Sequence, residues 1–167
     1  LSDLQILSLI EDEPDEKWKY VYQLLATYGL RPAELEYLVV KDDGQGEEVW
    51  SMYEKSMGGK KGERTEPREL CPLPLIGADG KAVDFKLLER IKLGEDLPYL
   101  GRGGEVAMTM NTRFRRWDLW QRYRKEAERI KQVCVPYGFR HRHTKASHSK
   151  GVPIPKYCRK YGSYTRS

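Results

Sequence analysis

The sequence predicts a mixed, mostly helical α+β domain with a small antiparallel sheet on one edge. Apolar residues recur at helical spacing near the N-terminus and again after residue 106, whereas residues 39–75 alternate in type between glycine and proline turns. With 167 residues and 39% hydrophobic content, the chain can bury a core of its own. We therefore expect residues 1–167 to form a single domain.

Two helices are expected first. Ser2 is positioned to cap a helix that Pro14 stops, and Asp15 is positioned to cap the next one. In the second helix four apolar residues follow the i, i+3, i+4, i+7 spacing of one buried face: Trp18, Val21, Tyr22 and Leu25. We expect these four residues in the core.

A turn follows the second helix. Gly29 is typical of a helix C-terminus, and Pro32 is typical of the first position of a helix. The short helix that begins at Pro32 carries Leu35 and Leu38. Arg31 is therefore predicted to stand in the turn between two helices.

Residues 39–75 are typical of a hairpin-rich sheet. Strands are expected at 39–40, at 49–53 and at 68–73, with a glycine-rich tip at 58–62. The tip region carries three cations, Lys55, Lys60 and Lys61. An extended basic arm suits a groove of DNA, and it equally suits a solvated loop.

Two further helices are expected, one ending at Gly94 and a long one from about Val106 to Gln132. The long helix interleaves aromatic residues with arginines, and its aromatic residues are Phe114, Trp117, Trp120 and Tyr123. Such aromatics can stack on bases. We favour a buried aromatic stripe opposite a solvated basic face.

Charge and cysteine content limit the class of protein. The net charge is +5 and the pI about 9.0, with acidic residues dominant before Gly58 and cations dominant after Gly101. This asymmetry favours a polyanionic partner, nucleic acid before membrane, because no apolar run approaches the ~20 residues of a spanning helix. The odd number of cysteines, without a CxxC pair or signal peptide, predicts reduced thiols in an intracellular protein.

The most distinctive stretch is 135–149. The only three histidines of the sequence lie here among basic residues, in the order Arg140, His141, Arg142, His143, Lys145, His148. Pro136 and Gly138 predict a turn into a helix, whose first N–H groups add to the cations as an anion site. Phosphate is the ligand that this chemistry favours, and a solvated basic helix face is the alternative. The cysteine and histidine spacings do not fit a zinc finger.

Four segments together resemble the catalytic domain of the tyrosine recombinase family, which includes the phage integrases. They are TYGLRPAEL, YEKSMGGKKGERTEPRELCPLPL, YGFRHRHTKASHSKGVPIPKY and SYTRS. The resemblance covers nearly the whole chain in the family's order. It implies a tyrosine-recombinase-like fold, and the family's separate N-terminal core-binding domain is not within these residues.

The resemblance also implies a chemistry. In this family a tyrosine hydroxyl attacks a DNA phosphodiester, forms a 3′-phosphotyrosine link, and is later displaced by a hydroxyl of the partner strand, without metal or other cofactor. Arg31 and Arg140 match the two arginines that neutralise the phosphate. Lys55 matches the general acid, with Lys60 and Lys61 as alternates. His141 follows the second arginine, as in the family.

Two positions depart from the family pattern. Tyr137 stands where a histidine is usual, three residues before the second arginine; it can donate a hydrogen bond to phosphate but is a weak base. Gly162 is followed at once by Ser163, where a spacer of several residues is usual. Tyr164 is the expected nucleophile if residues are missing at this junction; otherwise Tyr161 and Tyr157 are candidates.

The expected partner is double-stranded DNA, contacted by Lys60, Lys61, Arg142 and Lys145, with no membrane contact. The resemblance implies a homo-tetramer on DNA and leaves open a monomer for the isolated fragment. The expected location is intracellular with the DNA, in the cytoplasm or nucleoid if the source is a prokaryote or phage. The alternative function is a non-cleaving nucleic-acid-binding module. The target sequence and the direction of recombination do not follow from these residues.

Overall fold

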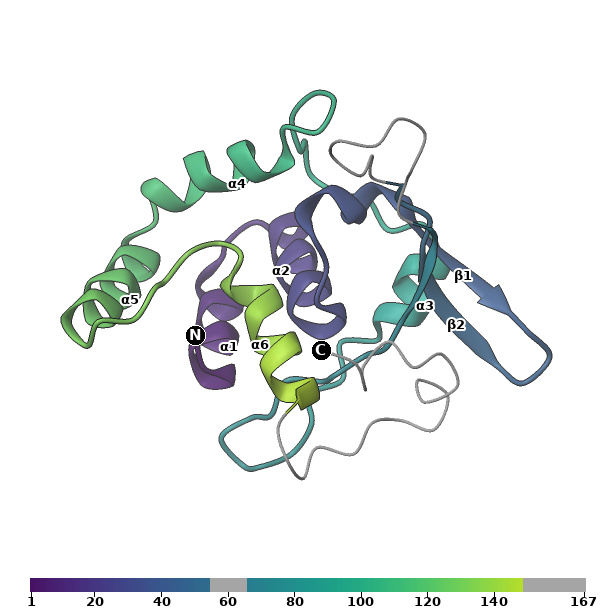
Figure 1. Ribbon diagram of the computed structural model, residues 1–167, viewed down its shortest axis with the longest axis horizontal. Helices are drawn as coiled ribbons and strands as arrows, with labels where there is room; N and C mark the ends of the chain where they lie inside the picture. The colour runs from purple at the N-terminus through teal and green to yellow at the C-terminus, as the bar shows by residue number, and fades with distance from the viewer. Residues whose placement is uncertain (55–65, 149–167) are drawn as a thin grey trace.

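The computed structural model describes residues 1–54 and 66–148, with side chains described through His143. Its elements, in chain order, are α1 (Asp3–Asp12), α2 (Glu16–Tyr28), the 3₁₀ helix η1 (Pro32–Tyr37), β1 (Leu38–Asp42), β2 (Glu47–Ser51), β3 (Arg68–Leu70), α3 (Leu87–Lys92), α4 (Val106–Arg115), α5 (Asp118–Arg129) and α6 (Gly138–His148). In Figure 1, α1, α2 and α6 cluster centrally, with the sheet on one side and α4 and α5 on the other. The predicted mostly helical α+β class is confirmed.

The first two helices have the predicted caps. The Ser2 hydroxyl accepts a hydrogen bond from the Gln5 N–H while the Gln5 side chain accepts one from the Ser2 N–H, which is a capping box. The Asp15 carboxylate accepts from the N–H groups of Lys17 and Trp18. Gly29 ends α2 in the left-handed conformation at φ +63°.

The sheet has three antiparallel strands in the order β1-β2-β3. The β1–β2 register pairs Leu38 with Ser51, and the β2–β3 register pairs Ser51 with Arg68. Ser51 is therefore the central member of a row across all three strands. The predicted hairpin tip at 58–62 lies outside the described residues.

The long helix predicted from Val106 to Gln132 is wrong in one respect, because the chain breaks into α4 and α5 at Trp117. The Trp117 indole donates a hydrogen bond to Asp12 and its ring stacks on Tyr22, with centroids 5.4 Å apart. These contacts to distant segments hold the chain in an extended conformation at Trp117, with φ −99° and ψ 109°. Helix propensity along 106–132 is overridden by tertiary packing.

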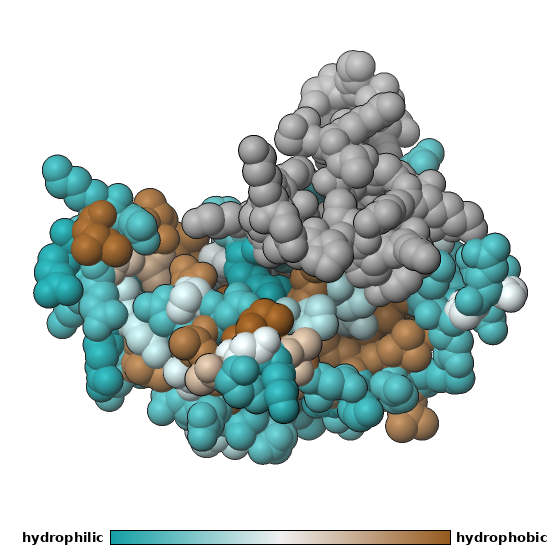
Figure 2. Space-filling view, turned by 90° about the horizontal axis from the view of Figure 1, so that it is seen from below, coloured by the Kyte–Doolittle hydropathy of each residue, from teal (hydrophilic) through white to brown (hydrophobic). Residues whose placement is uncertain are grey.

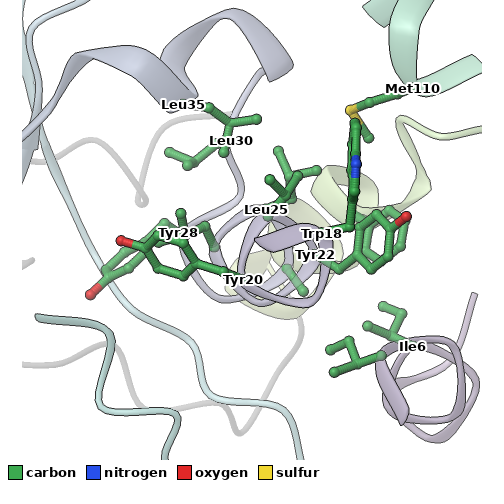
Figure 3. Packing of buried hydrophobic residues seen from close by; sticks show 14 of the residues in the cluster. Ile6, Trp18, Tyr20, Tyr22, Leu25, Tyr28, Leu30, Leu35 and Met110 are labelled. Carbon is green, nitrogen blue, oxygen red and sulfur yellow. The ribbon is translucent and has the colours of Figure 1, made fainter. Parts of the chain in front are cut away.

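The core is built around α2. Figure 3 shows Trp18 and Tyr22 beside Met110 of α4, while Leu30 and Leu35 lie together beyond the end of α2. Tyr22 is fully buried and contacts the rings of Trp18, Phe114, Trp117 and Phe139. Because Phe139 belongs to α6, this aromatic cluster anchors the predicted functional helix to the centre of the molecule.

The aromatic stripe of α4 and α5 faces inward, as predicted. Phe114 and Trp120 are buried, whereas the arginines beside them are exposed: Arg115, Arg116, Arg122, Arg124 and Arg129. Figure 2 shows a face on which hydrophilic residues predominate and the hydrophobic patches are small. Base stacking by these tryptophans therefore has no support in the packing.

Cys71 is disulfide-bonded and Cys134 is a free thiol. The prediction that the cysteines are reduced is therefore wrong for Cys71. Within residues 1–54 and 66–148, no helix combines the length and apolar character that crossing a bilayer requires.

Candidate functional site

Arg31 lies where the sequence predicts it, between α2 and η1. Gly29 reverses the chain after α2, and Pro32 begins η1 with Arg31 as its N-cap at φ −71° and ψ 143°. The Arg31 N–H donates to the Glu34 carboxylate at 2.8 Å. This bond closes the turn on itself and fixes the Cα position from which the Arg31 guanidinium projects.

Glu34 is a buried acid of this region, with 2% of its surface exposed. Besides the Arg31 N–H, it accepts from the Ser51 hydroxyl at 3.1 Å and from Nε and Nη2 of Arg68 at 3.0 and 2.9 Å. Burial alone would raise the pKa of Glu34, but the bonds from Arg68, Arg31 and Ser51 lower it overall. The carboxylate thus joins η1 to β2 and β3 as a stable anion.

Arg140 stands in the first turn of α6, about half-buried, with its guanidinium over the Tyr137 ring at 5.7 Å from the centroid. Burial is the main cause that lowers the pKa of Arg140; Tyr137 and Glu34 oppose the shift, and the charges of Arg31 and Arg68 add to it. The charges of Arg31 and Arg68, from two other segments, therefore act on Arg140 together with the carboxylate of Glu34.

His143 explains why α6 occupies this position. Its ring is 4% exposed and donates from Nε2 to the Cys71 carbonyl at 2.9 Å. Burial lowers the pKa of His143 to about 4, opposed by the bond to Cys71 and aided by nearby arginines including Arg140. The ring also lies on Gly29 so closely that a Cβ there would come within 2.5 Å of the His143 Cγ. This contact joins α6 to the end of α2, two residues before Arg31.

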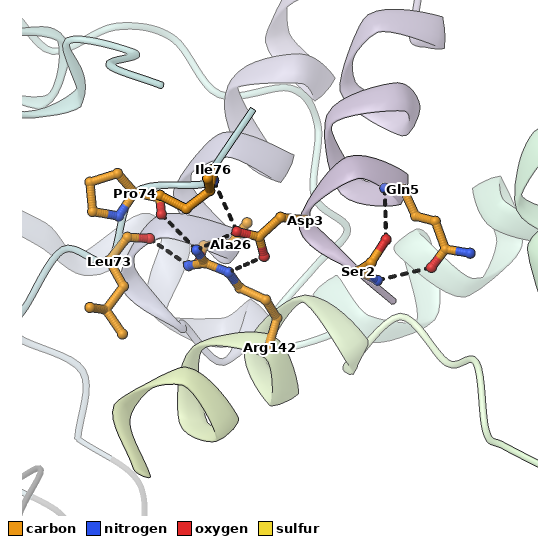
Figure 4. Close-up of polar contacts among 8 residues, drawn as sticks. All are labelled: Ser2, Asp3, Gln5, Ala26, Leu73, Pro74, Ile76 and Arg142. Carbon is orange, nitrogen blue, oxygen red and sulfur yellow. Dashed lines mark hydrogen bonds and ion pairs between the residues drawn. The ribbon is translucent and has the colours of Figure 1, made fainter. Parts of the chain in front are cut away.

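Arg142 corrects one prediction. Its side chain is 7% exposed, and Figure 4 shows its guanidinium between Asp3 and the backbone after β3. Nε and Nη2 donate to the Asp3 carboxylate at 2.8 and 3.1 Å, and Nη1 and Nη2 donate to the carbonyls of Ala26, Leu73 and Pro74. These contacts use all five N–H groups of a guanidinium. Arg142 is a structural residue, and the expectation that it contacts DNA is wrong.

Tyr137 and His141 flank Arg140 on the outside. Tyr137 is 40% exposed, and its ring meets that of His141 edge to face with centroids 5.3 Å apart. Both side chains reach solvent beside the half-buried guanidinium. They are placed where they can contact a molecule bound to Arg140.

The remaining predicted site residues lie outside what the structure describes. They are Lys55, Lys60, Lys61, Tyr164 and the side chain of Lys145. The same holds for the alternative tyrosines, Tyr157 and Tyr161.

Two residues of the site were missed by sequence reasoning. Glu34 is visible only as part of the GLRPAEL segment, and Arg68 only as one cation of a returning strand. A buried acid next to a turn arginine signals a need for a cationic partner. Nothing local identifies Arg68 as that partner, because the two residues are 34 positions apart.

A cavity of about 540 Å³ lies elsewhere, between the α1–α2 junction and the α4–α5 pair. Trp18, Met108, Trp117 and the paired Glu13 and Arg113 are among its lining residues. It includes none of the arginines around Glu34. This cavity is therefore separate from the candidate functional site.

Comparison with known proteins gives one relative. The chain is 29% identical over 151 residues to Excisase C of Nostoc sp. (strain PCC 7120 / SAG 25.82 / UTEX 2576), covering 87% of this chain and 27% of that protein. The chain thus spans about a quarter of its relative's length. No protein-family model matches, and no solved structure matches.

Proposed function

We propose that this chain takes part in site-specific DNA recombination as the strand-cleaving domain of a tyrosine recombinase. The observation that carries the proposal is that His143 of α6 packs on Gly29 at the end of α2, which brings Arg140 of α6 to the turn that holds Arg31 although the two arginines are distant in the sequence. The similarity to a protein named Excisase C supports a role in recombination. The GLRPAEL and YGFRH segments support the finer assignment.

The electrostatics favour an anionic ligand. The charges of Arg31 and Arg68 repel that of Arg140, and Glu34 offsets them only in part, so cationic charge is in excess among these four residues. A phosphate would relieve this repulsion, and planar guanidinium groups can each hold two of its oxygens. In the proposed reaction Arg31 and Arg140 stabilise the charge that develops on the non-bridging oxygens.

Other residues complete the proposed reaction. Tyr164 attacks the phosphorus to form the 3′-phosphotyrosine, and Lys55 gives a proton to the leaving 5′-oxygen. Tyr137 and His141 donate hydrogen bonds to the same phosphate. Reversal by a 5′-hydroxyl of another strand completes the exchange, so the bond energy is conserved and no cofactor is consumed.

We further propose that double-stranded DNA is held by Lys60, Lys61 and Lys145, and that the active assembly on DNA is a homo-tetramer. Residues 1–167 would then act as a single catalytic domain within a longer recombinase, with a tyrosine-recombinase-like fold.

The test is covalent capture. A nicked DNA substrate loses its short 5′-hydroxyl fragment after cleavage, so an active enzyme accumulates a protein–DNA adduct that survives denaturing electrophoresis. Tyr164→Phe is expected to abolish the adduct, and Tyr161→Phe and Tyr157→Phe serve as matched controls that also identify the nucleophile if it is not Tyr164. Arg31→Gln and Arg140→Gln should each slow the reaction about 10²- to 10³-fold. Arg90→Gln, on α3, should not.

DNA sequences selected from a random duplex library by binding to the wild-type chain provide the substrate. Salt-sensitive binding without any adduct from the wild-type chain would favour the non-cleaving nucleic-acid-binding module. Neither binding nor adduct would refute both functions.

A further inference from the structure

Arg68 occupies an unusual position at the base of the hairpin. It is the first residue of β3 and pairs across the sheet with Ser51 of β2. Both side chains donate to the same carboxylate, that of Glu34. The hairpin base is therefore attached to η1 through one buried anion.

The attachment continues to the Arg31 turn. The Glu34 oxygen that accepts from Nη2 of Arg68 also accepts from the Arg31 N–H, at 2.9 and 2.8 Å. The two hydrogen bonds from the Arg68 guanidinium fix the orientation of the Glu34 carboxylate. The carboxylate in turn holds the Arg31 N–H and thereby the Arg31 turn. Lysine provides a single point charge and cannot do the same.

We propose that Arg68 is a positioning residue of the cationic site, which acts through Glu34 to hold the Arg31 turn and the paired strands β2 and β3 in one fixed geometry. This inference rests on the proposed function. Nε and Nη2 of Arg68 are already bonded to Glu34, so its role is to orient Arg31 and not to replace it. The charge of Arg68 also helps to lower the pKa of Arg140, so β3, the Arg31 turn and α6 all contribute to one site.

The arrangement has a consequence for the proposed general acid. Lys55 follows Ser51 by four residues in the sequence, and Arg68 begins the strand that returns. The Arg68–Glu34 pair therefore fixes both the turn of one proposed phosphate ligand and the base of the segment that carries the proton donor. Loss of the pair should affect the rate of cleavage more than the affinity for DNA.

The experiment compares Arg68→Lys with Glu34→Gln and with their double variant. Single-turnover adduct formation on the nicked substrate gives the rate, and fluorescence anisotropy gives the affinity for DNA. A misplacement on the scale of 1 Å costs on the order of 100-fold in rate, so we expect Arg68→Lys to lose about that much. Its affinity for DNA should stay at the wild-type value because the charge is kept.

Arg90→Lys is the matched control. Arg90 also gives Nε and Nη2 to one carboxylate, that of Glu95, and is 25% exposed, against 34% for Arg68. The Arg90→Lys variant should leave the rate of adduct formation unchanged. If Arg68 acts through Glu34, the double variant should be no slower than the slower single variant.

Additive losses in the double variant would show that Arg68 contacts the substrate directly, which overturns the proposal. A wild-type rate for Arg68→Lys would overturn it as well. If the wild-type chain forms no adduct, the proposed function fails. The positioning role of Arg68 is then tested by the binding of inorganic phosphate, measured as a rise in melting temperature. Phosphate should raise the melting temperature of the wild-type chain and of Arg90→Lys more than that of Arg68→Lys; equal shifts in all three would refute the positioning role.

Discussion

Gly29→Ala tests how α6 is attached to the Arg31 turn. Gly29 has φ +63°, a left-handed conformation that costs a residue with a Cβ about 1–2 kcal/mol of folding free energy. The added Cβ would also lie 2.5, 2.6 and 2.7 Å from the Cγ, Nδ1 and Cβ of His143. That ring is buried and bonded to the Cys71 carbonyl, so displacing it sacrifices a hydrogen bond worth about 1–3 kcal/mol in a buried site. The total expected loss of unfolding free energy is about 2–5 kcal/mol.

Gly80→Ala is the matched control. Gly80 has φ +78°, and nothing lies within 4 Å of the Cβ that would be added. The Gly80→Ala variant should lose only the unfolding free energy that the left-handed backbone conformation costs, about 1–2 kcal/mol. Urea unfolding followed by tryptophan fluorescence measures both values. The double variant Gly29→Ala/His143→Ala should lose less than the sum of its single variants, because alanine at position 143 removes the overlap.

Equal losses for Gly29→Ala and Gly80→Ala would refute the close approach of His143 to the end of α2. Strict additivity in the double variant would do the same. Either result would mean that the contact between His143 and Gly29 does not bring Arg140 to the Arg31 turn.

Three further predictions concern stability, pH and salt. Arg142→Met should lower the unfolding free energy measured in urea by about 3–5 kcal/mol, because it leaves Asp3 and several carbonyls without their buried cationic donor. A loss under ~1 kcal/mol would contradict the structural role of Arg142. The unfolded chain protonates His143 below pH 6.5 but the folded chain only below about 4, so the unfolding free energy should fall by about 3 kcal/mol as the pH drops through this window. The difference in urea midpoint between the wild type and His143→Gln, measured across this pH range, isolates the contribution of His143. A difference that does not change with pH would contradict it. DNA affinity should fall steeply with salt, and Lys60→Gln/Lys61→Gln should flatten the slope of log K against log salt by about 2; an unchanged slope would exclude these lysines as phosphate contacts.

The sequence predicted those features whose causes are local. The caps Ser2 and Asp15, the helix end at Gly29 and the position of Arg31 each depend on residues within one turn of the chain. The break at Trp117 was not predictable in this way, because Asp12 and Tyr22 cause it from more than ninety positions away.

The error on Arg142 has a geometric cause. Arg140 and Arg142 are two residues apart on α6, so they project about 200° apart around the helix axis and cannot hold the same phosphate. The same spacing separates exposed His141 from buried His143. A run of alternating arginine and histidine on a helix therefore predicts one outward and one inward pair, and the contacts of Phe139 with the core and of His143 with Gly29 decide which is which.

The most direct test of the proposed site is whether Arg31 and Arg140 bind one anion together. The measurement is the inorganic phosphate dissociation constant, obtained from the rise in melting temperature at constant ionic strength, for the wild type, Arg31→Gln, Arg140→Gln and the double variant. If both guanidinium groups hold the same phosphate, each single variant should bind markedly more weakly, and their effects should not add. Wild-type affinity in both single variants would contradict a shared phosphate site.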